Sequence, residues 1–170
     1  MNFSLAQKRI TKVFVYGTLK RGMSNAQFIP NYTIKKSQKA TTTGTLYYVR
    51  SGAFPCLKLR GNNTIHGELY TIEKRWWKQT LRDMDMLEGY PTLYDRKIIE
   101  VETENGKDRC WTYVYNGEDG LGEEIITGTF TGRNPNAPKY SSVYDYYYNQ
   151  EPHVFTDEEL EKYYKNIFKY

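Results

Sequence analysis

Residues 13–25, VFVYGTLKRGMSN, begin as a β-strand and end as a turn. The first four are β-branched or aromatic, as strands favour, whereas Gly17, Gly22, Ser24 and Asn25 are turn formers. The two glycines have the spacing of a Walker phosphate loop, but Met and Ser follow where that loop needs Lys and then Ser or Thr. The turn therefore does not predict a nucleotide-phosphate site, and what it holds must be inferred from the rest of the chain.

Length and composition favour one ordinary globular domain. The chain has 170 residues, a net charge of +4 and 17 tyrosines. A chain of this length can bury a substantial core. Its charges are mixed along the sequence rather than massed in blocks, so the small basic excess does not by itself predict a nucleic-acid partner. The tyrosines fit the edge of a core better than a stacking platform for bases.

Targeting and redox signals predict a cytoplasmic protein without membrane contact. Residues 1–30 hold no apolar run of the secretory type, and no segment approaches the roughly 18 apolar residues of a membrane span. The two cysteines, Cys56 and Cys110, lie far apart in apolar surroundings. We expect two small buried hydrophobic residues rather than a disulfide or a catalytic thiol.

Strand-like segments dominate the first two thirds of the chain. They are residues 12–19, 41–50, 53–59, 64–72, 95–103 and 109–115. The last two flank Asn105 and Gly106, and Asn-Gly between alternating strands is a strong hairpin signal. So much strand in a short span predicts a curved or barrel-like sheet.

One helix interrupts the strands, within residues 73–91. Trp77, Leu81, Met84 and Glu88 follow at steps of four, three and four, so they share one helix face, and a Gly and a Pro then give a stop signal. An apolar stripe that ends in a carboxylate has two interpretations. Either Glu88 is buried and needs a partner or a function, or the frayed helix end leaves it in water.

A buried Glu88 would have the properties of an acid–base catalyst. Burial and the negative end of the helix dipole both disfavour its charged form and raise its pKa. A carboxyl group whose pKa lies near neutrality can accept a proton in one step and return it in the next.

Other site chemistries find little support. His66 and His153 lie far apart and no Cys-x-x-Cys is present, so we expect no metal site. Basic residues interleaved with aromatics, KRWWK at 74–78 and KYYKNIFKY at 162–170, could contact a nucleic acid, but both equally fit amphipathic helices. A nucleic-acid-binding module therefore remains a less favoured alternative, and we expect no nucleic-acid partner.

The composition changes after Phe130. Residues 131–153 are rich in Pro, Asn, Gly and Ser and predict a long connection. Residues 156–170 begin with a Thr-x-x-Glu capping box and continue with apolar residues at helical spacing. We expect a domain over residues 1–131 and an extension over 132–170 that ends in an amphipathic helix, docked on the same structural unit or on a second copy.

Five short motifs occur in an order that resembles a known family. They are VYGTL at 15–19, FPCL at 54–57, HGELY at 66–70, LEGY at 87–90 and LYDRKIIEV at 93–101. Together they make residues 12–117 resemble the γ-glutamyl cyclotransferase-like superfamily, specifically its γ-glutamylamine cyclotransferase and AIG2-like branch. One such motif alone would be a weak signal, but five in order are specific.

The resemblance implies an α+β fold, a small mixed β-barrel with flanking helices, to which the C-terminal amphipathic helix is added. It also implies an enzyme that uses no cofactor. In that family the α-amine of a γ-glutamyl group attacks its own γ-carbonyl, which closes 5-oxoproline and expels the attached amine. The expected partner is a small γ-glutamyl compound, and the expected state is a monomer or a homodimer.

The resemblance also assigns residues to the site. The turn at 16–19 would offer backbone N–H groups to the substrate, and Glu88 would be the general acid and base. A side chain at Gly17 would block the close approach of a ligand. The expected substrate-binding residues are Tyr16, Gly17, Thr18, Leu19, Asn25, Tyr94, Arg96 and Tyr115.

Two of these assignments have ordinary structural alternatives. Tyr94 and Arg96 could equally be a strand-pair tyrosine and a surface arginine. Of Tyr113 and Tyr115, which alternate with their neighbours along one strand, we expect only one to point inward.

Two alternatives to this enzyme remain. A protein of the same fold could release γ-glutamyl groups from an unusual carrier, or a related protein could bind γ-glutamyl compounds or amino acids without catalysis. Retention of Glu88 argues against a pure binder, which does not need a carboxylate at the end of an apolar stripe. The sequence does not identify the leaving amine.

Overall fold

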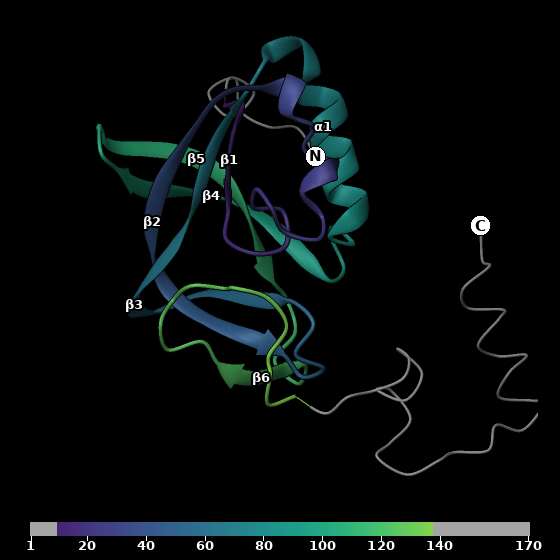
Figure 1. The fold of residues 1–170 in the computed structure, drawn as a ribbon, viewed down its shortest axis with the longest axis vertical. Helices are drawn as coiled ribbons and strands as arrows, with labels where there is room; N and C mark the ends of the chain where they lie inside the picture. Colours follow the sequence, from purple (N-terminus) through teal and green to yellow (C-terminus); the bar gives the residue numbers. More distant parts are fainter. Residues whose placement is uncertain (1–9, 138–170) are drawn as a thin grey trace, which may run out of the picture. The chain divides into compact units, whose positions relative to one another are not determined.

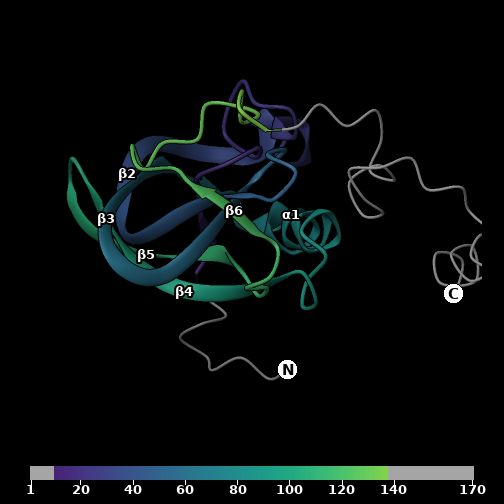
Figure 2. The same cartoon turned by 90° about the horizontal axis from the view of Figure 1, so that it is seen from below.

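The computed structural model describes residues 10–137, which form a closed β-barrel with one long helix on its side (Figures 1 and 2). Its strands are β1 (Lys12–Val15), β2 (Ile34–Val49), β3 (Pro55–Ile72), β4 (Tyr94–Thr103), β5 (Gly106–Tyr115) and β6 (Leu121–Glu124). Helix α1 (Lys74–Leu87) follows β3, and two short 3-10 helices, η2 (Ala26–Phe28) and η3 (Asn31–Thr33), follow the turn after β1.

The barrel is mixed. The strand order is β3-β1-β5-β4-β2, and a further pairing of β2 with β3 closes the ring, while β6 adds to the free edge of β2. β1 is parallel to β5, and every other pairing is antiparallel. This confirms the expected small mixed β-barrel with flanking helices. The C-terminal helix expected at 156–170 lies outside the described residues.

Residues 13–15 of β1 are buried on both faces of the strand, which explains their unbroken apolar sequence. Val13 and Val15 belong to the core cluster that also contains Met84 of α1. Phe14 and Tyr16 belong to a second cluster with residues of β2, β3, β4 and β5. The short strand therefore lies between the helix-side core and a second core formed by the barrel strands.

The expected strands at 53–59 and 64–72 are one strand, β3, rather than two. The register pairs Thr45 with Lys58 and Gly44 with Asn63, so the residues between 58 and 63 form a bulge instead of a turn. Gly61 takes a left-handed backbone with φ of +88°, and the Thr45 hydroxyl donates to the Arg60 carbonyl at 2.8 Å. The polar residues between 58 and 63 form a bulge instead of ending the strand, because β2 pairs with β3 on both sides of them.

The expected hairpin at Asn105 and Gly106 is confirmed. β4 pairs with β5 over its whole length, from Tyr94 opposite Tyr115 to Thr103 opposite Gly106. Cys56 and Cys110 are both free and buried, as expected. The described part of the chain contains no helix long and apolar enough to cross a membrane.

The first described residues of the predicted extension pack on the barrel domain. The backbone N–H of Asn134 donates to the carbonyl of Gly52 at 2.9 Å, and the amide of its side chain donates to Glu123 at 3.0 Å. The contacts of the barrel domain therefore continue past the domain boundary that we expected between residues 131 and 132.

Lys58 is a buried cation that joins β3 to the end of β5. Its ammonium group donates to the carbonyl of Tyr115 at 2.9 Å and pairs with Glu118 at 2.9 Å. Arg60 pairs with the same carboxylate at 2.8 Å, but its side chain is 56% exposed against 9% for Lys58. The two cations thus share one anion in different surroundings.

We predict that Lys58→Met lowers the free energy of unfolding by about 1–3 kcal/mol, because it leaves the buried Tyr115 carbonyl without its donor. Arg60→Met is the matched control and should cost less than about 1 kcal/mol, as exposed ion pairs do. Urea unfolding of the two variants measures both values. Equal losses would show that the carbonyl contact of Lys58 contributes nothing.

Candidate active site

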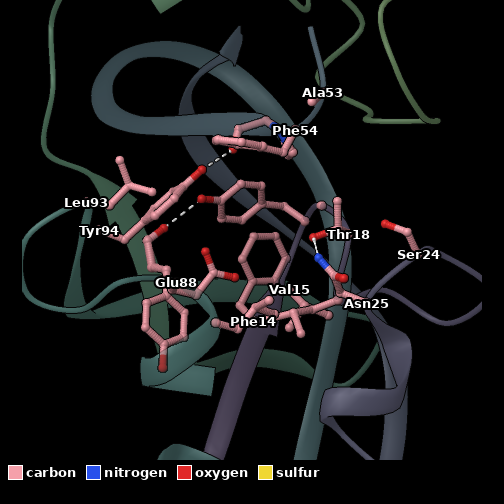
Figure 3. A pocket seen from close by; sticks show the side chains of 16 residues that line it. Phe14, Val15, Thr18, Ser24, Asn25, Ala53, Phe54, Glu88, Leu93 and Tyr94 are labelled. Atoms are coloured by element: carbon pink, nitrogen blue, oxygen red, sulfur yellow. Dashed lines mark hydrogen bonds between the residues drawn. The ribbon is translucent and has the colours of Figure 1, made fainter. Parts of the chain in front are cut away.

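A cavity of about 280 Å³ opens where the end of β1, the start of β3 and the end of α1 meet (Figure 3). It is lined by Phe14, Val15, Tyr16, Gly17, Thr18, Leu19, Ser24, Asn25, Ala53, Phe54, Pro55, Leu87, Glu88, Leu93, Tyr94 and Tyr113. Of the residues predicted from the sequence, the cavity brings together Glu88, the whole 16–19 turn, Asn25 and Tyr94. Glu88 carries the one charged side chain among the described lining residues.

The turn at 16–19 is closed by its own backbone and by Asn25. Gly17 O accepts from Lys20 N at 3.1 Å, and Thr18 O accepts from Asn25 N at 2.9 Å. The Asn25 side-chain amide also donates to the Thr18 hydroxyl at 3.0 Å. Within residues 10–137 the N–H groups of Gly17, Thr18 and Leu19 have no backbone acceptor. These three residues line the cavity, while Asn25 braces the turn.

Gly17 lies against the side chain of Pro55. A Cβ atom at this position would lie 2.5 Å from Pro55 Cγ and 3.0 Å from Cδ. Such a contact would push the turn away from the start of β3, and both segments line the cavity. The glycine is therefore required by packing within the protein, in addition to the ligand approach that the sequence led us to expect.

Glu88 follows the last residue of α1 and points into the cavity. Figure 3 shows its carboxylate on the opposite side of the space from Thr18 and Asn25. Its backbone N–H continues the helix by donating to Met84 O at 2.9 Å. Glu88 is thus held by helical geometry at the cavity wall, and the alternative of a frayed terminus in water is wrong.

Burial raises the pKa of Glu88 to about 7. Among the described residues no hydrogen bond or ion pair stabilises its charged form. Its titratable neighbours in the core are Tyr16, Cys56, Tyr94 and Tyr113, whose own pKa values burial raises: that of Cys56 to about 12, and those of the three tyrosines further above their ordinary value. Near neutral pH these four groups are uncharged, so Glu88 is the group of this set that changes charge.

Tyr94 forms a cavity wall, and its position is fixed. Its hydroxyl donates to the carbonyl of Pro55 at 2.8 Å, and its ring meets the edge of Tyr115 with centroids 5.3 Å apart. Tyr115 is buried but is not among the lining residues. It therefore supports Tyr94 from behind instead of facing the cavity.

The expectation that only one of Tyr113 and Tyr115 points inward is wrong. Both are buried in the same core cluster, because residues two apart in a strand share a face. Tyr113 lines the cavity, and its carbonyl accepts from the Tyr16 hydroxyl at 2.8 Å. The two-residue period of β5 was the signal that could have identified it.

Arg96 does not line the cavity, and it is not a surface residue either. Its side chain is 8% exposed and pairs with Asp85 at 3.0 Å. The guanidinium carbon lies 4.2 Å from the centroid of the Tyr90 ring. The apolar part of the cavity, formed in part by Phe54 and Leu93, was also missed, because apolar side chains carry no chemical signal in a sequence.

Metal chemistry finds no ligand set here. Within residues 10–137 no group of three or more His, Cys, Asp or Glu side chains could hold a metal ion. The polar groups of the lining residues are the Glu88 carboxylate, hydroxyl and amide side chains, and the backbone of the turn.

Similarity to known proteins extends over the whole barrel. Residues 13–131 match the family described as gamma-glutamyl cyclotransferase, AIG2-like. The chain is 36% identical over 115 residues to the gamma-L-glutamyl-butirosin B gamma-glutamyl cyclotransferase of Niallia circulans, covering 64% of this chain and 69% of that one. It is 31% identical over 121 residues to a putative gamma-glutamylcyclotransferase of Vibrio cholerae, covering 71% of this chain and 96% of that one.

The fold is also found in a solved structure. The crystal structure of a mouse AIG2-like protein superposes with a TM-score of 0.60 at 20% identity, over 78% of this chain and 98% of that one. At this identity the likeness concerns the fold alone. The sequence match over residues 13–131 places the chain in the AIG2-like γ-glutamyl cyclotransferase family.

Proposed function

We propose that this protein is an enzyme that releases 5-oxoproline and a free amine from a γ-glutamyl amine or a related γ-glutamyl compound. The observation that carries the proposal is the Glu88 carboxylate, which faces the 16–19 turn across the cavity with a pKa near 7. The names of the relatives from N. circulans and V. cholerae support the same reaction class.

Glu88 serves two proton transfers in this proposal. The substrate's α-ammonium gives a proton to the Glu88 carboxylate, and the freed amine attacks its own γ-carbonyl carbon. A carbon–nitrogen bond forms, and the bond to the departing amine then breaks. Glu88, now a carboxylic acid, gives its proton to the departing nitrogen, and as a carboxylate it then takes the second proton that the cyclised nitrogen must lose to become the lactam N–H. That second proton passes to the released amine, which leaves as an ammonium ion. One group whose pKa lies near the working pH suits both steps.

The turn at 16–19 binds the oxygen atoms of the glutamyl group. The N–H groups of Gly17, Thr18 and Leu19 can bind a carboxylate, or the negative charge that develops on the γ-carbonyl oxygen during attack. Backbone donors suit this task because they carry no titratable proton and are already ordered by the turn. Neutral donors also leave the Glu88 pKa set by its burial.

The reaction balances without a cofactor. It exchanges one amide bond for another within a single molecule and moves two protons from the attacking nitrogen to the departing one, so it needs no electron acceptor, nucleotide or water. Phe54, Leu93 and Tyr94 contribute apolar surface to the cavity wall.

We predict that the protein forms 5-oxoproline from at least one member of a panel of γ-glutamyl amines, γ-glutamyl dipeptides and glutathione. Liquid chromatography of 5-oxoproline and of the free amine, released in equal amounts, measures the reaction. Addition of a metal chelator should leave the rate unchanged. Absence of product from the whole panel, or loss of turnover with the chelator, would contradict the proposal.

Glu88→Gln should lower turnover by ~10²–10⁴, the usual contribution of general acid–base catalysis, with substrate binding retained. The amide keeps the size of the side chain but cannot carry a proton between the two nitrogens. Glu102→Gln, at an exposed position on β4, is the matched control and should retain wild-type turnover. Equal rates for Glu88→Gln and the wild type would remove Glu88 from the mechanism.

Glu88 should also make the folded state less stable as pH rises. Its pKa is about 7 when folded and near 4.5 when unfolded, so the folded state binds the extra proton between these values. The resulting stabilisation is complete below the unfolded pKa and is lost as pH rises through the folded one. Relative to wild type, Glu88→Gln should therefore gain about 1–3 kcal/mol between about pH 4 and pH 8. Thermal melts at both pH values test this, and a constant difference would disprove it.

A further inference from the structure

Asp85 lies one helical turn before Glu88 and is held from two strands. Its Oδ1 accepts from the Tyr113 hydroxyl at 2.7 Å and pairs with Arg96 Nε at 3.0 Å. Arg96 on β4 and Tyr113 on β5 are directly opposite in the register. Arg96 is further fixed by its stacking on Tyr90, whose backbone N–H donates to Asp85 O at 2.9 Å. The last turn of α1 is thereby tied to the β4–β5 pair.

The same contacts reach the turn on the other side of the cavity. The Tyr113 hydroxyl donates a hydrogen bond to Asp85, and the Tyr113 carbonyl accepts one from the Tyr16 hydroxyl at 2.8 Å. Tyr16 is the first residue of the 16–19 turn. A continuous path therefore runs from Arg96 through Asp85 and Tyr113 to Tyr16, and it joins the helix end that carries Glu88 to the segment that would bind the glutamyl oxygens.

We infer that Asp85, Arg96 and Tyr113 form a positioning network that fixes the Glu88 carboxylate at its distance from the 16–19 turn. None of the three needs to touch the reacting atoms through its polar group, since the Tyr113 hydroxyl and the Arg96 guanidinium are both engaged with Asp85. A proton carrier misplaced by an ångström can lose on the order of 100-fold in rate, so a rigid link of this kind has a catalytic effect. The effect of the network on catalysis rests on the proposed function, whereas its effect on the position and the pKa of Glu88 does not.

The network also keeps Glu88 desolvated. The titratable groups around it, Tyr16, Cys56, Tyr94 and Tyr113, are uncharged near neutral pH because burial raises each pKa. The charges of Asp85 and Arg96 are paired with each other. When the helix end loosens, water reaches Glu88 and stabilises its charged form. The pKa of Glu88 therefore reports whether the network holds.

The test compares Tyr113→Phe, Asp85→Asn and the double variant with the wild type. Tyr113→Phe removes one oxygen atom and keeps the ring that lines the cavity, so it remains informative where Asp85→Asn fails to fold. Asp83→Asn is the matched control on the same helix, because the Asp83 carboxylate accepts a hydrogen bond from Gln79, one helical turn earlier in α1. Carbon-13 NMR of labelled Glu carboxyl groups, assigned with Glu88→Gln, gives the Glu88 pKa, and 5-oxoproline release gives kcat and KM.

We expect the Glu88 pKa to fall from about 7 toward 4.5 in both single variants, and kcat to fall about tenfold or more with KM nearly unchanged. The double variant should lose no more than the larger single loss, as coupled residues do. Asp83→Asn should match the wild type. An unchanged Glu88 titration in Tyr113→Phe and in Asp85→Asn would overturn the network. A lowered pKa in the variants of a protein that releases no 5-oxoproline would keep the network and refute the proposed function.

Discussion

Burial of β1 on both faces is the constraint on which the rest of the structure depends. This strand of four residues pairs antiparallel with β3 and parallel with β5, so the barrel closes through it. Val13 and Val15 pack toward the helix, while Phe14 and Tyr16 pack toward the second core. A strand confined on both faces has one register, and its end is therefore fixed in space. The turn that follows is placed by this strand, and its residues line the cavity.

Much of the fold could be predicted because its signals are local. The apolar run at 13–16, the hairpin at Asn105 and Gly106, and the stripe of α1 each lie within a few residues of sequence. The bulge in β3 could not be predicted, because Arg60-Gly61-Asn62-Asn63 has the composition of a turn and only the long partner strand β2 keeps it in the sheet. Closure of the ring by β2 and β3 likewise depends on pairings between distant segments.

The same distinction between local signals and distant pairings applies to the residues of the site. The place of Glu88 at the cavity could be predicted since its helix period and its family motif agree, and that of the turn since its motif is contiguous. The contacts of Arg96 and Tyr113 with Asp85 could not, because they join residues that lie 11 and 28 positions apart along the chain. Tyr115 was chosen over Tyr113 although both share a face, and only the shape of the cavity separates a lining residue from the one behind it.

Asp85 and Glu88 are carboxyl groups one helical turn apart, and their different surroundings give them different pKa values. Burial raises the pKa of Asp85, but the hydrogen bond from Tyr113 and the charge of Arg96 limit the rise. Glu88 is buried without such compensation, so its pKa reaches about 7. A carboxylate with two partners is a fixed anchor, whereas one without them exchanges its proton easily near neutral pH. Glu88, which lines the cavity, thus titrates one helical turn after a carboxylate that two partners fix, and in our proposal the fixed carboxylate holds the helix end in place.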